Sequence, residues 1–426
     1  MKKNSIKKSF PPEEWLAFNK KFKIFNNRGV TFPKGFLVSA VNSGIKKNRS
    51  DLVLIISEKE SVAAGVFTTN RVQAAPVQFC KKNIKNSING ILINSGCANS
   101  YTGKKGEEDI ISILSELSQK WFGLNFNNFL MASTGVIGTR LPVKKIKRAL
   151  PVLISNLQSN NNADIKAAKG IMTTDTVYKT VATSFYIGNK EVRIGAMAKG
   201  AGMISPNMAT MLVFVTTDVS ISRKCLQEAL KETIEQSFNR ISVDGDTSTN
   251  DSVIILANAK SENRIISSKN HDYKIFCEHL LYIFKILAWK IVSDGEGVTK
   301  VFLVKVKNAK DKKDAEKVCR TIANSLLVKT AVFGEDFNWG RIVNAIGYSN
   351  ASFNPERLDL SISDLYIIKK GRFQKQNEKK LEKIFKKNFF TVNVNLNASK
   401  DKRAESMILT TDLSYDYIKI NADYRS

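Results

Sequence analysis

The feature that most constrains the fold is a repeated change between short apolar segments and longer segments with helical spacing. Residues 51–57, 61–69 and 90–94 are apolar runs of strand length, whereas residues 107–122 place apolar side chains at every third or fourth position. The change continues through the second half of the chain. Strands that alternate with amphipathic helices are typical of sheets covered by helices, so the sequence predicts an α/β fold.

Further elements are expected from the same pattern. The expected strands are residues 130–133, which run into a turn at 134–135, and residues 181–187, 191–197, 210–216, 252–257, 301–306, 390–396, 407–413 and 415–420. The expected helices are residues 142–157, 163–172, 223–238, 271–292, 314–328 and 378–387, and Pro151 is expected to kink or interrupt the first of them. Residues 1–30 are polar and basic, and we expect a loose arm there. A chain of 426 residues is long for one core, so two domains or one large α/β unit are expected.

The composition is strongly basic. The chain has 66 Lys and Arg against 39 Asp and Glu, a formal net charge of +27, and such a charge can attract nucleic acid. The basic residues are nevertheless spread along the chain and occur together with Asn and Ile, as in residues 144–147, which is typical of codon drift in an AT-rich genome. No zinc-finger spacing and no RNA-recognition aromatic signature occurs. We therefore expect no nucleic-acid partner, and a basic binding protein without catalysis stays as an alternative.

Cysteine usage and hydropathy indicate a reducing compartment. The five cysteines are odd in number and widely spaced, and no C-x-x-C or His/Asp/Glu cluster has metal-ligand spacing. The first 15 residues lack the apolar core of a secretory signal. The longest apolar stretch, residues 280–291, is broken by Lys285 and Lys290 and is too short and charged to span a bilayer. The expectation is a cytoplasmic protein without a metal and without a membrane segment.

Elimination narrows the chemistry that the residues can carry. Only two histidines occur, His271 and His279, and both lie in one segment, so a Ser–His or Cys–His pair is poorly supported. The glycine-rich residues 199–202 do not match a P-loop or a dinucleotide-binding fingerprint. Threonines, glycines, asparagines and acids gathered at turns remain as the candidate functional residues.

The densest such stretch is residues 198–212, a loop with Gly and Pro that leads into the apolar segment beginning at Thr210. This arrangement suits an N-terminal nucleophile, because a Thr hydroxyl in a strained loop can attack the preceding carbonyl, here that of Ala209, and release a new α-amine. With an unperturbed pKa of about 7.7–8.0, that amine can act as a general base without a histidine. An ordinary loop before a strand is the other interpretation of the Ala-Thr step.

Several motifs together resemble the ornithine acetyltransferase family, the glutamate N-acetyltransferases of arginine biosynthesis, over about residues 29–426. In chain order they are residues 33–36 (PKGF), 64–70 (AGVFTTN), 94–99 (NSGCAN), 133–138 (STGVIG), 172–176 (MTTDT), 198–211, 242–251 (SVDGDTSTND), 294–297 (DGEG), 338–341 (NWGR) and 415–426. Any one motif could arise by chance, but so many in the same order make coincidence negligible.

The resemblance implies a catalytic role for three residues. Thr210 would be both the self-cleavage residue, with the cut between Ala209 and Thr210, and the group that carries acetyl from N2-acetylornithine to glutamate as an ester. Thr134 and Gly135 would form the oxyanion hole with one hydroxyl and one backbone N–H. Such a donor aimed at a developing oxyanion contributes roughly 3–4 kcal/mol.

The resemblance also implies a substrate pocket. Its residues would be Thr173, Lys199, Thr210, Glu296, Asn421 and Ser426. Lys199 suits a substrate carboxylate, and Glu296, which lies between two glycines, suits an ammonium group. The sequence does not decide between Thr173 and the adjacent Thr174, and Thr173 is favoured. The acidic loop with Asp244, Asp246 and Asp251 lacks the full spacing of a Ca²⁺ loop and is interpreted as structural.

For the fold and assembly, the resemblance implies a layered α-β-β-α architecture of a self-processing, N-terminal-nucleophile-like acyltransferase. Two interlocked fragments, α (1–209) and β (210–426), would pair as a heterotetramer of two α and two β fragments. Small amino-acid substrates are implied and no cofactor, and use of acetyl-CoA as a second acetyl donor is left open. A related self-processing amidase or aminopeptidase, which passes the acyl group to water, is the alternative enzyme.

Overall fold

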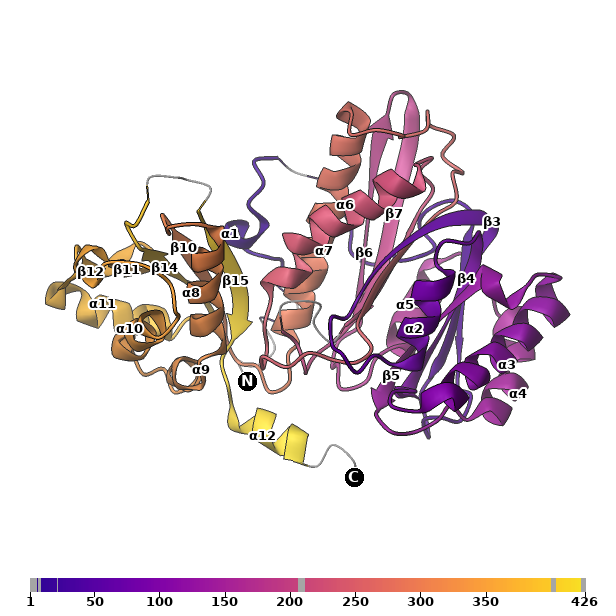
Figure 1. Ribbon diagram of the computed structural model, residues 1–426, viewed down its shortest axis with the longest axis horizontal. Coiled ribbons are helices and arrows are strands. Elements are labelled where there is room, and N and C mark those ends of the chain that lie inside the picture. Colours follow the sequence, from indigo (N-terminus) through magenta and orange to yellow (C-terminus); the bar gives the residue numbers. More distant parts are fainter. Residues whose placement is uncertain (1–5, 7–8, 21, 206–210, 400–403, 423–426) are drawn as a thin grey trace. The chain divides into compact units, whose positions relative to one another are not determined.

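The computed structural model describes residues 6, 9–20, 22–205, 211–399 and 404–422. The chain forms two units, each with its own sheet. The large unit contains residues 16–239 and 246–291, and the small unit contains residues 1–15, 240–245 and 292–426. In Figure 1 the small unit is mostly the orange-to-yellow part of the ribbon.

Nine strands among the described residues form the sheet of the large unit, in the order β1-β6-β7-β8-β9-β3-β4-β5, with β2 paired to β3. Their bounds are β1 (Ile24–Phe25), β2 (Phe36–Val41), β3 (Leu52–Phe67), β4 (Ile88–Cys97), β5 (Phe129–Val136), β6 (Lys179–Ile187), β7 (Lys190–Lys199), β8 (Leu212–Thr217) and β9 (Ser252–Ala257). The neighbours pair antiparallel except β4 with β5 and β8 with β9, which are parallel. The helices are α2 (Ala75–Asn83), α3 (Gly103–Phe122), α4 (Val143–Ser155), α5 (Asn161–Gly170), α6 (Arg223–Glu235) and α7 (His271–Ser293).

The long strand β3 divides this sheet into two halves. Its first part pairs with β2 and β4, its second part pairs with β9, and the register shifts between Ile56 and Ser61. Buried side chains of both halves, such as Ile55 on β3 and Phe214 on β8, belong to one hydrophobic cluster. The two halves therefore pack face to face, as in a sandwich.

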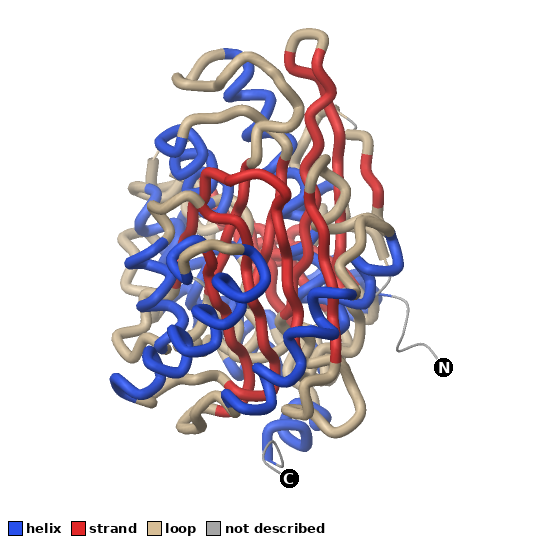
Figure 2. The backbone as a smooth tube through the Cα atoms, turned by 90° about the vertical axis from the view of Figure 1, so that its right-hand side faces the viewer, coloured by secondary structure: helices blue, strands red, loops and turns tan. Residues whose placement is uncertain are grey.

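Helices cover the two outer faces of this sandwich. On one side α3 and α4 pack on the half formed by β3, β4 and β5, for example through Ile113 and Leu150 against Leu92. On the other side α6 packs against β3, and α7 packs against β6, where the His279 ring stacks on Phe185. Figure 1 shows the strands between these helix pairs, and Figure 2 shows strands running side by side behind a layer of helices. The α-β-β-α layering that the family resemblance implies is confirmed.

In the part of the small unit that the structure describes, six strands form a sheet in the order β13-β12-β11-β14-β10-β15, in which only β10 and β14 pair in parallel. Its strands are β10 (Val301–Lys307), β11 (Asp359–Ile362), β12 (Leu365–Lys369), β13 (Arg372–Phe373), β14 (Phe389–Asn395) and β15 (Ser406–Thr411), and its helices are α8 (Lys312–Asn324), α9 (Leu326–Phe333), α10 (Trp339–Gly347), α11 (Glu378–Phe385) and α12 (Tyr415–Ala422). Helices α8 to α11 share one hydrophobic cluster with the sheet, for example Val318 and Ile346 with Val304 and Val392.

Two sequence predictions placed an element boundary wrongly. The expected strands at residues 51–57 and 61–69 are one continuous strand, β3, because the chain stays extended while it changes partner. The single helix expected at residues 314–328 is two helices, because Ser325 is extended and its hydroxyl accepts a hydrogen bond from the Val328 N–H, which caps α9. Pro151 lies inside α4 without interrupting it.

Two further predictions assigned the wrong structure to the ends of the chain. The expected last strand, residues 415–420, is helix α12, whose Tyr417 N–H donates to the Ser414 hydroxyl in the manner of a helix cap. The expected loose arm, residues 1–30, is ordered in part, since Trp15 in α1 (Glu13–Leu16) is fully buried and β1 pairs with β6. Tertiary contacts decide both segments, and local composition does not reveal them.

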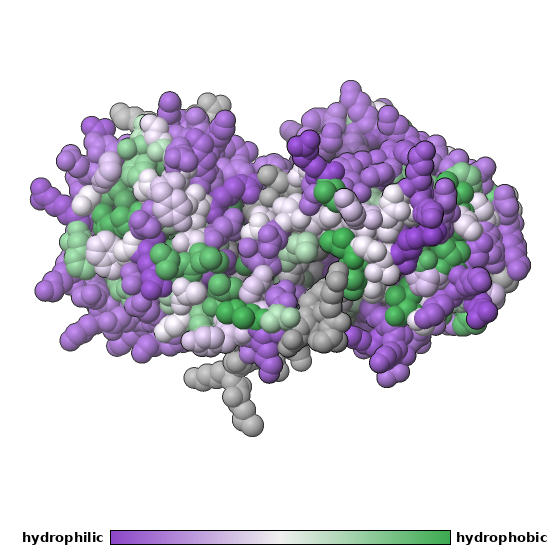
Figure 3. Space-filling view, turned by 60° about the horizontal axis from the view of Figure 1, so that its bottom comes forward, coloured by the Kyte–Doolittle hydropathy of each residue, from purple (hydrophilic) through white to green (hydrophobic). Residues whose placement is uncertain are grey.

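The surface is largely hydrophilic. Figure 3 shows hydrophilic residues over most of the visible face of each unit, between separate apolar patches. Some exposed large apolar side chains are isolated in the sequence, such as Val152 and Ile265, whereas Leu326 and Leu327 are adjacent. Within the described residues, no helix is long and apolar enough to cross a membrane.

The sandwich core yields a stability prediction. Phe214 on β8 is fully buried between the two halves of the sheet. Phe214→Ala should lower the free energy of unfolding by about 3–5 kcal/mol, because it removes a large apolar group and leaves a cavity. Tyr186→Ala on β6, where the side chain is exposed, should change it by less than about 0.5 kcal/mol. Thermal melting checks both, and equal shifts for the two variants would contradict the packing described here.

Candidate active site

Thr134 and Gly135 lie near the end of β5, where the sequence predicted a turn; the strand instead continues to Val136. Gly135 pairs with Gly96 on β4 and has a φ of +134°. A Cβ at this position would lie 2.3 Å from the carbonyl carbon of Gly96, so only glycine fits. The two predicted oxyanion residues are therefore held by a close parallel pairing, and the Thr134 side chain is buried.

Lys199 lies at the end of β7 and is also buried, so it is not one of the many solvated surface lysines. Its Nζ donates a hydrogen bond to Oγ1 of Thr134 at 3.3 Å. Because a hydroxyl can accept and donate at once, the Thr134 hydrogen stays able to donate to another group. The structure thus brings two predicted site residues into contact.

Asp175, which sequence reasoning did not single out, organises this part of the site. Its Oδ1 accepts hydrogen bonds from Lys179 Nζ and from the Gly200 N–H, both at 2.7 Å, and its Oδ2 accepts from the Thr173 N–H at 3.1 Å. Burial alone would raise the pKa of Asp175, but Lys179, Lys199 and the Gly200 N–H stabilise the carboxylate, so its pKa lies well below its ordinary value of 3.8. The carboxylate is ionised, and it fixes the backbone of Thr173, before β6, and the backbone of Gly200, after β7.

Thr173 and Thr174 lie in the segment between α5 and β6 and are both half-buried. Of these two threonines, only Thr173 is hydrogen-bonded to Asp175, through its backbone N–H. Next to this segment, Lys46 donates from Nζ to the Met172 carbonyl at 2.6 Å and to the Ser95 hydroxyl. Burial, together with nearby Arg49 and Lys199, lowers the pKa of Lys46 to about 8. No sequence pattern distinguishes Lys46 from the other lysines.

The start of β8 is fixed by the loop that precedes β9. The Met211 N–H donates to Oδ1 of Asp251 at 3.0 Å, and the Ser252 N–H donates to the Met211 carbonyl at 3.1 Å. The neighbouring Asn250 donates from Nδ2 to the carbonyls of Ala98 and Ser133, at 2.7 and 2.8 Å. This loop therefore connects the beginnings of β8 and β9 with the ends of β4 and β5, where Thr134 lies.

The predicted nucleophile lies just before this point. Ala209 and Thr210 precede Met211 directly and lie outside the described residues, as does Ser426. Among the residues that the structure describes, no group of three or more His, Cys, Asp or Glu side chains could hold a metal ion.

Glu296 and Asn421 meet in the small unit. Glu296 follows α7, is buried, and accepts through Oε2 a hydrogen bond from Asn421 Nδ2 at 2.8 Å. Asn421 lies on α12 and also donates to the Tyr417 carbonyl at 3.0 Å. Gly297 has a φ of +68°, and a Cβ there would lie 2.4 Å from the Tyr417 nitrogen, so the glycine allows α12 to approach Glu296. Two of the six residues that the resemblance implies for the pocket are therefore in direct contact.

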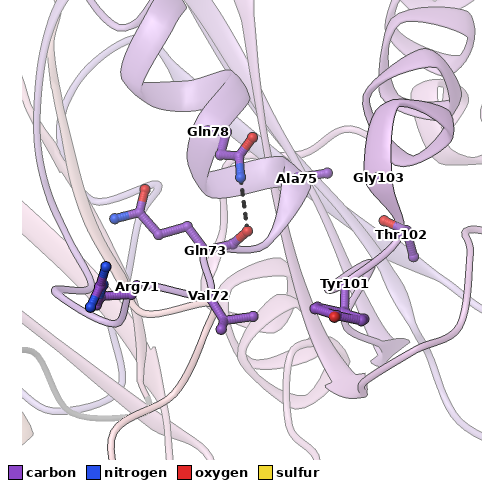
Figure 4. A pocket seen from close by; sticks show the side chains of 8 residues that line it. All are labelled: Arg71, Val72, Gln73, Ala75, Gln78, Tyr101, Thr102 and Gly103. Carbon is purple, nitrogen blue, oxygen red and sulfur yellow. Dashed lines mark hydrogen bonds between the residues drawn. The ribbon is translucent and has the colours of Figure 1, made fainter.

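A surface hollow of about 430 Å³ lies at the first turns of α2 and α3 in the large unit (Figure 4). It is lined by Arg71, Val72, Gln73, Ala75, Gln78, Tyr101, Thr102 and Gly103. The segment that supplies its left wall in Figure 4 is tied to the loop before β9, because Ala74 N–H donates to the Thr249 carbonyl at 2.9 Å. Through this hydrogen bond the hollow adjoins the loop that carries Asp251.

Comparison with known proteins gives a consistent result. A model of the ArgJ family matches residues 37–426. The arginine biosynthesis bifunctional protein ArgJ of Caldanaerobacter subterraneus subsp. tengcongensis is 42% identical over 93% of this chain and 98% of its own length. The glutamate N-acetyltransferase of Methanocaldococcus jannaschii is 45% identical, again over 93% of this chain and 98% of its own.

Solved structures give shorter matches. The crystal structure of the arginine biosynthesis bifunctional protein argJ from Bacillus halodurans matches with a TM-score of 0.46 and 38% identity, over 49% of this chain and 97% of that one. Ornithine acetyltransferase from Mycobacterium tuberculosis, complexed with ornithine, matches with a TM-score of 0.40 and 32% identity, over 44% of this chain and 98% of that one.

The Asp175 centre yields a prediction with a defined pH dependence. Asp175→Asn should lower the free energy of unfolding at pH 7 by about 3–5 kcal/mol, because it leaves the buried Lys179 ammonium without its counter-charge. A carboxylate whose folded pKa is depressed contributes stability that is present above its unfolded pKa, near 3.8, and is lost as the pH falls below it. The difference between wild type and variant should therefore shrink below about pH 4.

Chemical denaturation across the acid range measures this difference. Glu191→Gln is the matched control, because the Glu191–Arg193 pair is about one-third exposed and should contribute at most about 1 kcal/mol. A wild-type advantage that persisted unchanged down to pH 2 would contradict an ionised Asp175.

Proposed function

The chain belongs to the ArgJ family, and we propose that it carries an acetyl group from N2-acetylornithine to glutamate as an ester on the Thr210 hydroxyl. It is an N-acetyltransferase of arginine biosynthesis. Water as the final acceptor, which a related amidase would use, is not favoured, because the relatives that match over nearly their whole length bear acetyltransferase and arginine-biosynthesis names.

The observation that carries the proposal is the buried contact between Lys199 and Thr134. The ammonium holds the hydroxyl oxygen at 3.3 Å, so the hydroxyl hydrogen can point toward a reacting carbonyl. With the Gly135 N–H it supplies two donors for the oxyanion that forms when an acyl group is attacked. Lys199 also places a positive charge where a substrate carboxylate can bind.

In the proposed reaction the α-amine of Thr210 takes the proton from the Thr210 hydroxyl, and the oxygen attacks the acetyl carbonyl of acetylornithine. The tetrahedral oxyanion is stabilised by Thr134 and Gly135, and ornithine leaves with the proton. The amine of glutamate then attacks the acetyl ester, and the Thr210 hydroxyl is restored. Both half-reactions use the same two oxyanion donors, as in a ping-pong mechanism in which one site serves both steps.

The sheet topology supports self-cleavage between residues 209 and 210 without separation of the products. Strand β7, before the cut, pairs with β8, after it, from Lys199 opposite Leu212 onward. Strands β8 and β9 lie between β7 and β3, so the β fragment (210–426) would supply two central strands to a sheet otherwise built by the α fragment (1–209). The fragments would be interlocked by main-chain hydrogen bonds, and we propose that two of each form a heterotetramer.

The nucleophile is tested with Thr210→Ala. The wild-type protein should give fragments of 209 and 217 residues on a denaturing gel, because the hydroxyl of Thr210 attacks the preceding carbonyl. The variant should remain one chain of 426 residues and lose acetyl transfer. An uncut enzyme with full activity would refute the mechanism.

Purified wild type supplied with glutamate and acetyl-CoA alone distinguishes a bifunctional from a monofunctional enzyme. The mass of the native protein in solution measures the assembly.

The substrate ammonium site is tested with Glu296→Gln. The amide can still accept the hydrogen bond from Asn421, so only the negative charge is lost. The KM for acetylornithine, whose side chain carries an ammonium, should rise about 10- to 100-fold, as expected for a charge-assisted hydrogen bond of roughly 1.5–3 kcal/mol. The KM for glutamate should change much less, and Glu378→Gln on the exposed surface of α11 should change neither. An equal rise for both substrates would argue against this role.

A further inference from the structure

Self-cleavage needs a proton acceptor that the transfer reaction does not need. This inference rests on the proposed function, in which the free α-amine of Thr210 serves as the base. Before the cut that nitrogen belongs to the amide bond with Ala209, and an amide nitrogen is not basic. Another group must therefore accept the proton of the Thr210 hydroxyl in the first, self-processing reaction.

The histidines do not supply this base. His271 is exposed at the start of α7, and His279 stacks on Phe185 and contacts the Thr183 hydroxyl on β6. Burial, together with nearby Lys20, lowers the pKa of His279 to about 4, so its ring is neutral and engaged in packing. The histidine contacts therefore lie on α7 and β6, and not at the start of β8.

Asp251 lies at that point. In the parallel pairing of β8 with β9, Leu212 is opposite Ser252, so Met211 and Asp251 occupy equivalent positions at the beginnings of two adjacent strands. Met211 donates its N–H to Oδ1 of Asp251 at 3.0 Å and accepts the Ser252 N–H at 3.1 Å. The nitrogen that Asp251 holds is covalently bonded to the carbonyl carbon of Thr210.

The second oxygen of this carboxylate has no partner among the described residues. Oδ2 of Asp251 is fully buried and accepts no hydrogen bond there, although Oδ1 is satisfied. Buried carboxylate oxygens are normally paired, because an unpaired one loses its hydration without compensation. The rest of the loop is firmly bonded: the Thr68 N–H donates to the Asp251 carbonyl, and Asn250 holds the ends of β4 and β5.

The electrostatic surroundings of Asp251 favour proton uptake. Burial raises the pKa of Asp251 well above its ordinary value of 3.8, and the Met211 N–H, Lys199 and the Ser248 backbone oppose this shift without cancelling it. Among the described residues, Lys199 on β7 is a charged side chain that acts on Asp251. A carboxylate with a raised pKa is a stronger base than an exposed one and can return its proton to a leaving group.

We propose that Asp251 is the general base of self-cleavage and that its Oδ2 accepts the proton of the Thr210 hydroxyl. As the proton moves, Oγ of Thr210 forms a bond to the carbonyl carbon of Ala209. The C–N bond between the two residues then breaks, and Asp251 returns the proton to the leaving nitrogen, which becomes the α-amine. Water hydrolyses the resulting ester to the Ala209 carboxylate and the free hydroxyl.

The test is the rate of self-cleavage of the full chain, pulse-labelled in cell-free translation and chased between pH 5 and 9. The wild-type rate should rise with pH and level off above the pKa of Asp251, because only the carboxylate accepts a proton. Asp251→Asn keeps an oxygen for the Met211 N–H but is not basic. It should cut at least about 100-fold more slowly and lose this titration.

Asp164→Asn is the matched control. Asp164 is equally buried and has a raised pKa, mainly because of burial, but both of its oxygens accept backbone N–H groups, from Gly29 and Thr31. It should lower the melting temperature without slowing the cut. A second arm uses Asp251→Ala with added formate, a small carboxylate, which should accelerate cleavage in proportion to its concentration.

The outcomes separate this inference from the proposed function. Wild-type cleavage without a carboxylate titration, a wild-type rate in Asp251→Asn, or no effect of formate on Asp251→Ala would each overturn the role of Asp251. Cleavage of Thr210→Ala at the same bond would instead overturn the proposed function itself. An uncut Thr210→Ala together with a normally cut Asp251→Asn would overturn only the inference.

Discussion

The parallel pairing of β8 with β9 is the interaction on which the rest of the candidate site depends. It places Met211 beside Asp251 and fixes the residue that follows the predicted nucleophile from both sides, through the Asp251 carboxylate and the Ser252 N–H. The loop that leads into β9 also binds the ends of β4 and β5 through Asn250. One short pair of strands thus connects the start of the predicted β fragment with the predicted oxyanion residues, and a shift of one residue in its register would disconnect them.

Much of the fold could be predicted because hydrophobic periodicity reports local structure. Strand β9 and the helices α3, α6 and α7 were found within a few residues of their ends. Errors occurred where tertiary contacts decide. β3 exchanges one partner for another without leaving the extended state, and Trp15 is buried although its neighbours are polar. The cap at Ser325 is a local signal, but it was missed because the apolar spacing continues across it.

The site could be predicted only as a set of separate motifs. Thr134 with Lys199, and Glu296 with Asn421, are indeed in contact, which no spacing in the sequence reveals. Asp175 and Lys46 were missed, since an Asp two residues after a threonine and one lysine among many carry no distinguishing pattern. Burial is what makes both residues matter. Burial alone would raise the pKa of Asp175, but Lys179 and Lys199 lower it below its ordinary value. These opposing effects of burial and neighbouring charge arise only in the folded structure.

The two buried carboxylates of the site differ in a way that stability alone does not explain. Asp175 is fully satisfied by an ammonium and two backbone donors, and it stabilises the fold once its desolvation is offset. Asp251 has one satisfied and one unsatisfied oxygen among the described residues, and such an arrangement costs about 1–3 kcal/mol or more.

An asparagine at position 251 could bind the Met211 N–H equally well through its oxygen and would avoid the charge. The ionisable group is therefore costly for the folded state, which is the reason for proposing a chemical role for it. The proposed self-cleavage would supply that benefit, because it is the one step in which the threonine has no amine of its own. A base used once in the life of each molecule need not turn over quickly, so a carboxylate held by a single strand pairing is sufficient.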